Sequence, residues 1–231
     1  MPNNYILEHI PFQADLDELA KTVRLKPGSP MFDDLRQMVI KAQALANPKV
    51  IYRVSLVEAG GERTVDIDGA EFTSRVLRVN LEKAHRVFPF VATCGRELKD
   101  WADTHADMLQ RFLVDAIMEQ ALFAALQELD RRLEERYQPG PLSSMNPGSL
   151  EDWPITQQRA LFGLFGDTHA QIGLELTESM LMIPAKSVSG VLFPSQEGFV
   201  ASCQLCPREL CPNRRELYNP ALFDRKYALT R

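Results

Sequence analysis

The stretch Asn146–Phe193, NPGSLEDWPITQQRALFGLFGDTHAQIGLELTESMLMIPAKSVSGVLF, carries the clearest structural pattern in this chain. Pro147-Gly148 predicts a tight turn. Asp152, which precedes Trp153-Pro154, is typical of a helix start, and Gly166 is typical of the end of that helix. The apolar face of the expected helix consists of Leu161, Phe162 and Phe165.

Two strands are expected after this helix. Ile172, Leu174 and Leu176 alternate with smaller or charged residues, which is the period of a strand with one buried face. A second strand, Val188 to Phe193, follows Pro184. Helix and sheet therefore lie in one continuous segment, which favours an α+β fold.

Three motifs in this segment stand at characteristic separations. They are LTES at 176–179, the methionine-rich MLMIP at 180–184 and the SVSG turn at 187–190, and they follow a PG turn and a short LFxLF helix. In this combination the chain resembles the activation domain of cobalamin-dependent methionine synthase and its free-standing relatives. The resemblance implies a single α+β domain over residues 1–231, in which helices pack on an antiparallel, twisted sheet.

The resemblance also implies a function. In that family the domain binds S-adenosylmethionine and holds the cobalamin domain in the geometry that permits reductive methylation of inactive cob(II)alamin. We therefore expect a cytoplasmic accessory protein that supports reactivation of a corrinoid protein or methyltransferase, with cobalamin carried by the partner. An independent methyltransferase is a weaker hypothesis, because the sequence offers no general base with a defined partner.

The adenosylmethionine motif of the family is an Arg, three residues and then Gly-Tyr. Gly148 matches the glycine, whereas Ser144 stands at the Arg position and Ser149 at the Tyr position. Loss of the Arg removes a bidentate cation for the methionine carboxylate. Adenosylmethionine then binds through contacts around Gly148 and Glu178, or the cysteines supply an electron in its place. The cleft residues implied by the resemblance are Gly148, Ser149, Asp152, Glu178 and Ser179.

Three of the four cysteines form a C-x2-C-x4-C motif in the C-terminal segment 203–215. The two residues between Cys203 and Cys206 let both thiolates face one metal ion, and Cys211 adds a third thiolate. Cys94 precedes a long helix and is a candidate fourth ligand, because amides at a helix start lower the pKa of a thiol.

The identity of the ligand is left open by this motif. A proline follows both Cys206 and Cys211, which favours an iron–sulfur cluster. Zinc is the second alternative, because three cysteines and one other donor satisfy it, and reduced cysteines without metal are the third. Zinc would make the chain a non-catalytic interaction module of the same fold, stapled at its C-terminal end.

Composition excludes several function classes. The chain has 231 residues, enough for one substantial core, and a formal net charge of -5, which argues against a nucleic-acid footprint. No apolar segment is long enough to cross a bilayer, and Met1 to Ile10 lacks the pattern of a signal peptide. Cysteines crowded near one end are atypical of a disulfide framework.

The chain upstream of residue 146 predicts helices at both ends and strands between them. Turns separate the strands at short intervals and no crossover helix intervenes, so an antiparallel meander is expected. Asp115 lies inside an apolar helical segment, and we expect it to face the edge of the helix or to cap a loop. The expected elements are helices at 15–24 and 31–46, strands at 50–56, 64–67, 72–81 and 87–93, and one long helix or two nearly collinear helices at 98–137.

Overall fold

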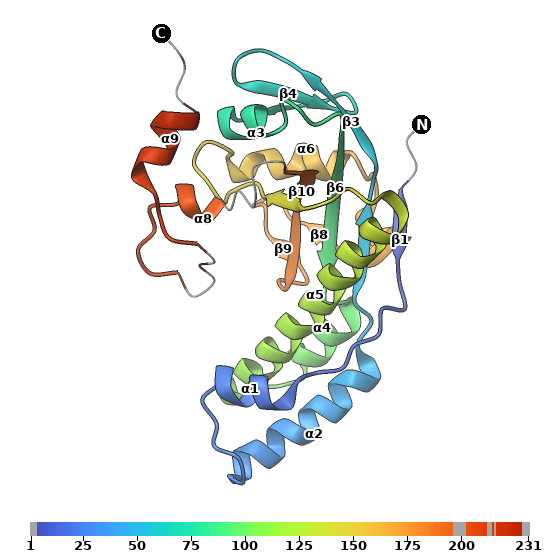
Figure 1. Cartoon of the computed structure of the whole chain (residues 1–231). Coiled ribbons are helices and arrows are strands. Elements are labelled where there is room, and N and C mark those ends of the chain that lie inside the picture. The colour runs from blue at the N-terminus through green and yellow to red at the C-terminus, as the bar shows by residue number, and fades with distance from the viewer. Residues whose placement is uncertain (1–3, 196–201, 212–213, 215, 228–231) are drawn as a thin grey trace.

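An antiparallel sheet forms the centre of the molecule (Figure 1). This computed structural model describes residues 4–195, 202–211, 214 and 216–227. The central strand is β6 (Arg86–Thr93), which pairs with β10 (Ser187–Pro194) along one edge and with β2 (Lys49–Tyr52) and β3 (Ser55–Ala59) along the other. All but the first residue of β6 are buried, as expected for a strand covered on both faces.

The other strands extend the sheet on both sides of β6. Strand β1 pairs with β2, β4 and β5 continue from β3, and β7 pairs with the outer edge of β10. Every pairing is antiparallel, so the α+β class predicted from the sequence is confirmed. The bounds of these strands are Tyr5–Leu7 for β1, Thr64–Ile67 for β4, Ala70–Thr73 for β5 and Leu142–Met145 for β7.

Alternate residues of β6 point into different cores. Phe88 and Phe90 pack with Leu129 and other residues of the long helix α5 (Met108–Tyr137) on one face of the sheet. Val91 packs on the other face in a core that includes Trp153. This period of two places one helix layer on each face of the sheet.

A third core joins the helices at the lower end of Figure 1. The N-terminal half of α5 packs there against three helices, and its side chains at 113, 117 and 121 are fully or almost fully buried. Two of these three helices begin with a local side-chain cap; for example, the Ser29 side chain accepts a hydrogen bond from the Phe32 amide. The three helices are α1 (Leu16–Thr22), α2 (Pro30–Leu45) and α4 (Arg96–Asp103).

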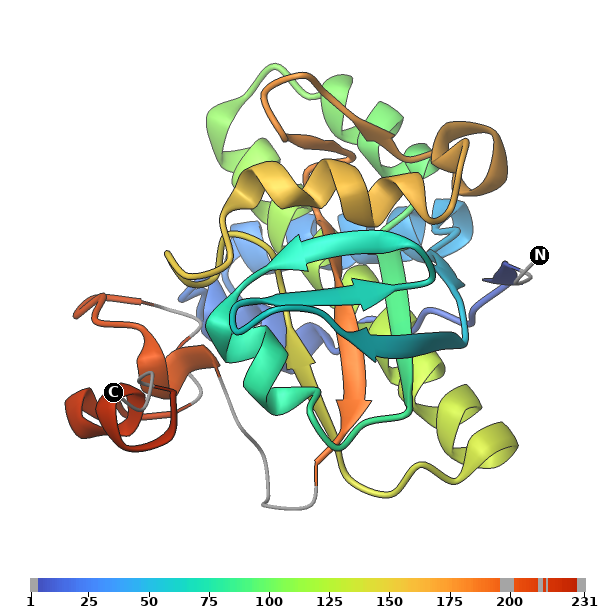
Figure 2. The same cartoon turned by 90° about the horizontal axis from the view of Figure 1, so that it is seen from above.

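The helical part of the stretch from 146 to 193 packs on the face of the sheet opposite α5. This part includes the buried residues Leu161, Phe162 and Phe165, as the sequence predicted, and Figure 2 shows it running above strands β3 to β5. The strand predicted at 188–193 is β10, whose paired residues begin at Ser187. The helical elements are η1 (Ile155–Gln157), α6 (Gln158–Gly163) and α7 (Thr168–Ile172).

The structure corrects two predicted strands. The run 72–81 changes from strand to helix at Ser74, whose hydroxyl accepts a hydrogen bond from the Leu77 amide and starts α3 (Arg75–Asn80). Ile172 belongs to helix α7, because Gly173 (φ +70°) ends that helix and leaves only a short strand after it. The short strands that follow are β8 (Glu175–Leu176) and β9 (Met182–Ile183), which pair with each other.

The segment 98–137, predicted as one long helix or two nearly collinear helices, forms two helices. Helix α4 ends at Asp103, and α5 begins at Met108 after Asp107 accepts a hydrogen bond from the Gln110 amide. An aspartate with this local hydrogen bond starts a helix more readily than it continues one. The apolar pattern alone did not show where the segment would divide. Asp115 lies at the helix edge, where its carboxylate is 2.9 Å from Lys186 Nζ.

The C-terminal elements α8 (Ser202–Leu205) and α9 (Pro220–Lys226) lie beside the sheet next to α3 (Figure 2). Tyr227 anchors them, because its ring is buried and its hydroxyl donates to Asn80 Oδ1 at 3.0 Å. The sequence also predicts a short strand at 198–202, of which residues 198–201 lie outside the described residues, and Ser202 begins α8. In the described part of the chain, no helix has the length and hydropathy to cross a membrane.

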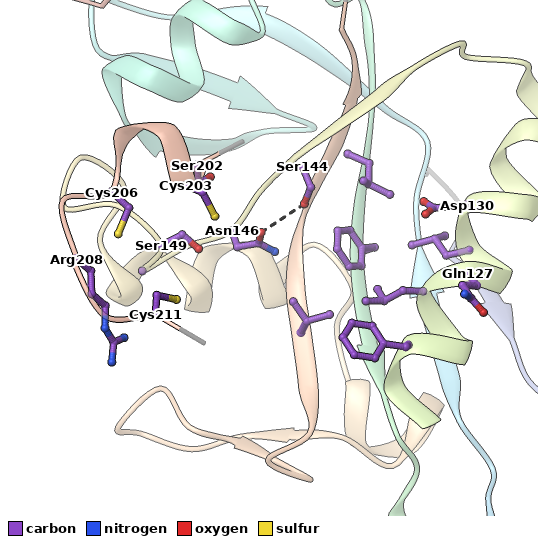
Figure 3. A pocket seen from close by; sticks show the side chains of 17 residues that line it. Gln127, Asp130, Ser144, Asn146, Ser149, Ser202, Cys203, Cys206, Arg208 and Cys211 are labelled. Atoms are coloured by element: carbon purple, nitrogen blue, oxygen red, sulfur yellow. Dashed lines mark hydrogen bonds between the residues drawn. The ribbon is translucent and has the colours of Figure 1, made fainter. Parts of the chain in front are cut away.

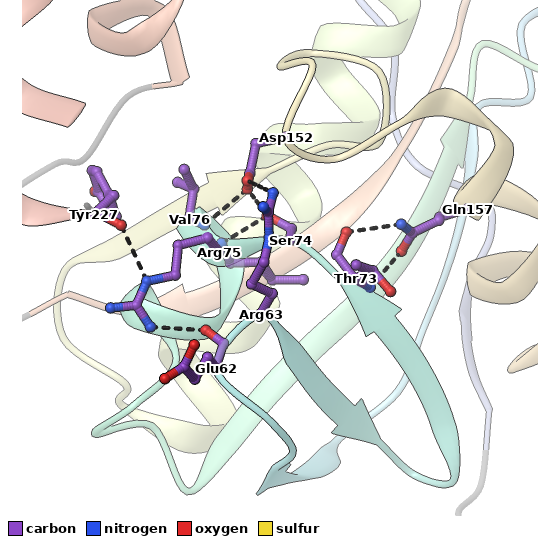
Figure 4. Close-up of polar contacts among 10 residues, drawn as sticks. Glu62, Arg63, Thr73, Ser74, Arg75, Val76, Asp152, Gln157 and Tyr227 are labelled. Atoms are coloured by element: carbon purple, nitrogen blue, oxygen red, sulfur yellow. Dashed lines mark hydrogen bonds and ion pairs between the residues drawn. The ribbon is translucent and has the colours of Figure 1, made fainter. Parts of the chain in front are cut away.

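Asp152 does not start the helix that follows it. Its half-buried carboxylate accepts hydrogen bonds from Ser74 Oγ and the Val76 amide, and lies 3.3 Å from Arg63 Nη2 (Figure 4). Asp152 thus caps α3 from a distant part of the sequence.

Replacing Asp152 by alanine should therefore lower the free energy of unfolding by about 1–3 kcal/mol, because the buried amide loses its acceptor. Urea denaturation measures this change. The matched control is Glu151→Ala at the exposed neighbouring position, for which less than about 0.5 kcal/mol is expected. Equal stabilities of the two variants would contradict this assignment.

Candidate functional site

A cavity of about 650 Å³ opens between α5, the central strands and the C-terminal segment (Figure 3). Residues from five parts of the chain converge on it, which is typical of a ligand site on an α+β scaffold. Its lining is Phe90, Phe123, Leu126, Gln127, Leu129, Asp130, Ser144, Asn146, Gly148, Ser149, Val188, Leu192, Ser202, Cys203, Cys206, Arg208 and Cys211.

The tight turn at Pro147-Gly148 forms one edge of the cavity. The Gly148 amide donates to the Trp153 carbonyl at 2.8 Å, and the Ser149 amide donates to the Asn146 carbonyl at 3.2 Å. Gly148 has φ +83°, and a Cβ there would lie 2.8 Å from Ile155 Cδ1. Glycine is therefore required at this position both by the backbone conformation and by the close packing.

A polar network fixes this turn to strand β10. Asn146 Nδ2 donates to the Ser189 carbonyl at 2.7 Å, and Ser144 Oγ lies 3.3 Å from Asn146 Oδ1. Gln158, which is buried, donates from Nε2 to Ser189 Oγ at 3.2 Å. Gly190 makes room for the network, since a Cβ there would lie 2.4 Å from Asn146 Nδ2. The network thus holds Ser144 and Asn146, the two of its residues that line the cavity, in one arrangement.

Helix α5 forms the opposite wall of the cavity. Phe123, Leu126, Gln127 and Asp130 line it at spacings of three and four residues, so they share one face of the helix. Phe123 is 46% exposed, which leaves an aromatic surface at the cavity edge. Sequence reasoning did not select these residues, although their helical spacing next to the buried face was a usable signal.

The third wall is the cysteine motif. Cys203, Cys206 and Cys211 are half-buried and lie on the side of the cavity where Ser149 lies (Figure 3). Arg214 holds this loop, because its guanidinium donates to the carbonyls of Cys203 at 3.1 Å, Cys206 at 3.3 Å, Glu216 at 3.2 Å and also Arg208. One side chain therefore replaces much of the backbone pairing that a regular element would provide.

Comparison with protein families identifies one part of the chain that lines this site. Residues 148–207 match the family described as vitamin B12 dependent methionine synthase, activation domain. These residues belong to the activation-domain family. A solved structure described as the MetH reactivation domain bound to AdoHcy shares the fold of this chain, with a TM-score of 0.60 and 18% sequence identity. The match covers 85% of this chain and 79% of that one, and a comparison with curated proteins gave no significant match.

The cavity includes two of the five residues expected in a cleft. Gly148 and Ser149 line it, whereas Asp152 is directed toward α3. Glu178 and Ser179 also lie elsewhere, in the exposed turn between β8 and β9. In that turn the Ser179 hydroxyl lies 3.0 Å from Thr177 Oγ1, and the Glu178 carbonyl faces Arg159 at 3.4 Å. Sequence proximity to the motif did not translate into proximity in space for these three residues.

Cys94 lies apart from the cysteine motif. It is fully buried in the core that joins α2, α4 and α5, and it does not line the cavity. Burial raises the pKa of its thiol to about 12, although amides at the start of α4 were expected to lower it. Among the described side chains, no three from His, Cys, Asp or Glu are grouped closely enough to hold a metal ion.

The four cysteines should therefore differ in reactivity toward iodoacetamide. At pH 8 the half-buried thiols of Cys203, Cys206 and Cys211 should be alkylated in the native, reduced, metal-free protein, whereas Cys94 should react only after unfolding. Peptide mass spectrometry after timed alkylation measures the order. Alkylation of native Cys94 at a rate similar to that of the other three would contradict its assignment to the core.

Proposed function

We propose that this chain is a cytoplasmic accessory protein that binds S-adenosylmethionine and supports reductive reactivation of a corrinoid partner. One observation carries the proposal: the Gly148–Ser149 turn, at the start of the family match, forms the edge of a cavity with an apolar middle and polar ends. That composition suits a nucleoside with a charged amino-acid tail. The structurally similar reactivation domain is described as bound to AdoHcy, the demethylated form of this ligand.

The proposed reaction takes place on the partner's cobalt. A one-electron donor reduces cob(II)alamin to cob(I)alamin, whose cobalt electron pair then attacks the methyl carbon of S-adenosylmethionine. The carbon–sulfur bond breaks, its electrons stay on sulfur, and the products are methylcob(III)alamin and S-adenosylhomocysteine. This chain contributes by fixing the sulfonium in the cavity and by presenting it to the corrinoid.

A surface for the corrinoid partner is offered by α5 and the β8–β9 turn. Met108 and Phe112 of α5 and Leu181 beside β9 are 85%, 52% and 66% exposed. Lys186, which lies between β9 and β10, ties the end of β9 to α5, since its ammonium lies 2.9 Å from Asp115 and 3.2 Å from Glu119. Exposed apolar side chains on two linked elements are typical of a protein contact surface.

Binding and reactivation are tested separately. Isothermal titration calorimetry with S-adenosylmethionine and S-adenosylhomocysteine measures occupancy of the cavity. Methylcobalamin formation is then followed by absorption, with a corrinoid protein, a titanium(III) reductant and S-adenosylmethionine, in the presence and absence of this chain. Acceleration by the chain is expected, and its loss in Phe112→Glu would support the docking surface. Absence of both binding and acceleration would overturn the proposal.

A second candidate function is favoured by the three thiols in the cavity wall. Cys203, Cys206 and Cys211 would hold an iron–sulfur cluster that delivers the electron, or zinc that staples an interaction module. Because the thiols are not grouped for a metal as they stand, binding would have to draw the loop together. Arg214 already positions the backbone of two of them.

Metal analysis distinguishes these two alternatives. Protein purified without oxygen is analysed for iron and zinc and by visible absorption, together with the Cys203→Ser, Cys206→Ser double variant. Iron with a broad visible band that is absent from the double variant would support electron delivery. Stoichiometric zinc in a colourless protein would support the interaction module, and protein free of both metals would exclude both.

A further inference from the structure

We infer that Arg208, in the C-terminal cysteine motif, binds the carboxylate of the methionyl group and so replaces the arginine that is absent at position 144. The inference rests on the proposed adenosylmethionine site. It assigns a charged recognition element to a part of the chain 64 residues away from the family motif position.

The cavity lacks a cation at the motif position. Ser144 lines the cavity, but its short hydroxyl side chain is directed at Asn146 Oδ1, 3.3 Å away. A carboxylate moved from water into the cavity needs a charged partner or several hydrogen bonds. Among the described residues that line the cavity, Arg208 is the only lysine or arginine.

The two described arginines of the loop have different surroundings. The guanidinium of Arg214 is occupied by four backbone carbonyls, so it holds the loop together. The side chain of Arg208 is exposed, and it has no hydrogen bond or ion pair with the described residues. Figure 3 shows its guanidinium at the outer edge of the cavity beyond Cys211. An exposed arginine keeps its rotamer freedom and can turn toward an arriving carboxylate, which its planar fork matches in two hydrogen bonds.

The charges of the cavity also orient the ligand. Asp130, the only carboxylate among the described lining residues, belongs to the α5 wall, and Figure 3 shows it on the opposite side from Arg208. Attraction by Arg208 directs a ligand carboxylate toward the cysteine wall, away from the Asp130 side of the cavity. The apolar side chains that line the cavity, including Phe90 and Leu192, are left to the nucleoside.

The test compares ligands with and without the amino-acid tail. Dissociation constants of S-adenosylmethionine and 5′-methylthioadenosine, which lacks the carboxylate and the ammonium, are measured by calorimetry for the wild type, Arg208→Ala, Arg208→Lys and the control Arg225→Ala. Arg225 is an exposed arginine of α9 that does not line the cavity. Arg208→Ala should weaken S-adenosylmethionine binding about 10- to 100-fold and leave methylthioadenosine binding unchanged.

The lysine variant should restore part of the lost affinity, because it keeps the charge but not the fork. Unchanged S-adenosylmethionine binding by Arg208→Ala would overturn the inference and leave the proposed function intact. Equal weakening of both ligands would overturn it as well, since Arg208 would then act on the loop rather than on the carboxylate. If the wild type binds neither ligand, the adenosylmethionine site itself fails, and this inference fails with it.

Discussion

Replacing Trp153 by alanine is expected to lower the free energy of unfolding by about 3–5 kcal/mol. The indole is fully buried, and its ring meets that of Phe72 edge to face with centroids 6.0 Å apart. Its Nε1 has no hydrogen-bond partner among the described residues, so the loss comes from the cavity and the lost apolar contacts. Since domains are stable by only about 5–15 kcal/mol, this single change removes a large part of the total.

Chemical denaturation followed by far-UV circular dichroism measures the effect of Trp153→Ala. Phe112→Ala is the matched control, because this aromatic side chain is 52% exposed and its removal leaves no internal cavity. We expect less than about 0.5 kcal/mol for the control. A change below about 1 kcal/mol for Trp153→Ala would show that Trp153 does not support the turn and the core beneath it.

Replacing Gly190 by alanine should both destabilise the protein and distort the cavity. The added Cβ would lie 2.4 Å from Asn146 Nδ2 and 2.6 Å from the Met145 carbonyl, which is backbone of strand β7 and has little room to move. Overpacking of this kind costs about 1–3 kcal/mol. Displacement of Asn146 would also break its bond to the Ser189 carbonyl and shift the turn at Gly148.

The two consequences of Gly190→Ala are measured by denaturation and by S-adenosylmethionine titration. Gly163→Ala is the control, because a Cβ at Gly163 meets no atom within 4 Å. Gly163 lies in α6, where alanine is the better helix former by about 1 kcal/mol, so the control should be neutral or stabilising. Equal stability of the two variants would contradict the close approach of β7 and β10.

Local patterns predicted much of the sheet from the sequence, because the side chains of β6 and β10 are apolar enough to show continuous buried runs. Apolar periodicity failed at Ser74, which starts a helix by accepting a hydrogen bond from the amide three residues ahead, a signal that apolar periodicity does not contain. Asp107 starts α5 in the same way, and it decides between the one long helix and the two helices that the sequence left open.

The candidate site was only partly predictable for a different reason. The resemblance selected residues that are close in sequence, and the turn at Gly148 and Ser149 does line the cavity. Asp152 is three residues further on, yet its carboxylate caps a helix built from residues 75–80. Tertiary packing alone decides which residues next to a motif face the cavity. The same packing places Asp130 of α5 in the cavity wall opposite the cysteine motif.

The pairing of β6 has a consequence for the order of folding. Strands β2 and β3 precede β6 closely in the sequence, whereas β10, on its other edge, follows after roughly a hundred residues. Because closing a long loop is slow, the edge of β6 toward β10 should stay open late in folding. During synthesis, the apolar strand β6 is complete once the ribosome has made α5. Its edge toward β10 is still unpaired at that stage, because β10 has not yet been made. Chaperone binding at this stage would protect the nascent chain from edge-to-edge aggregation.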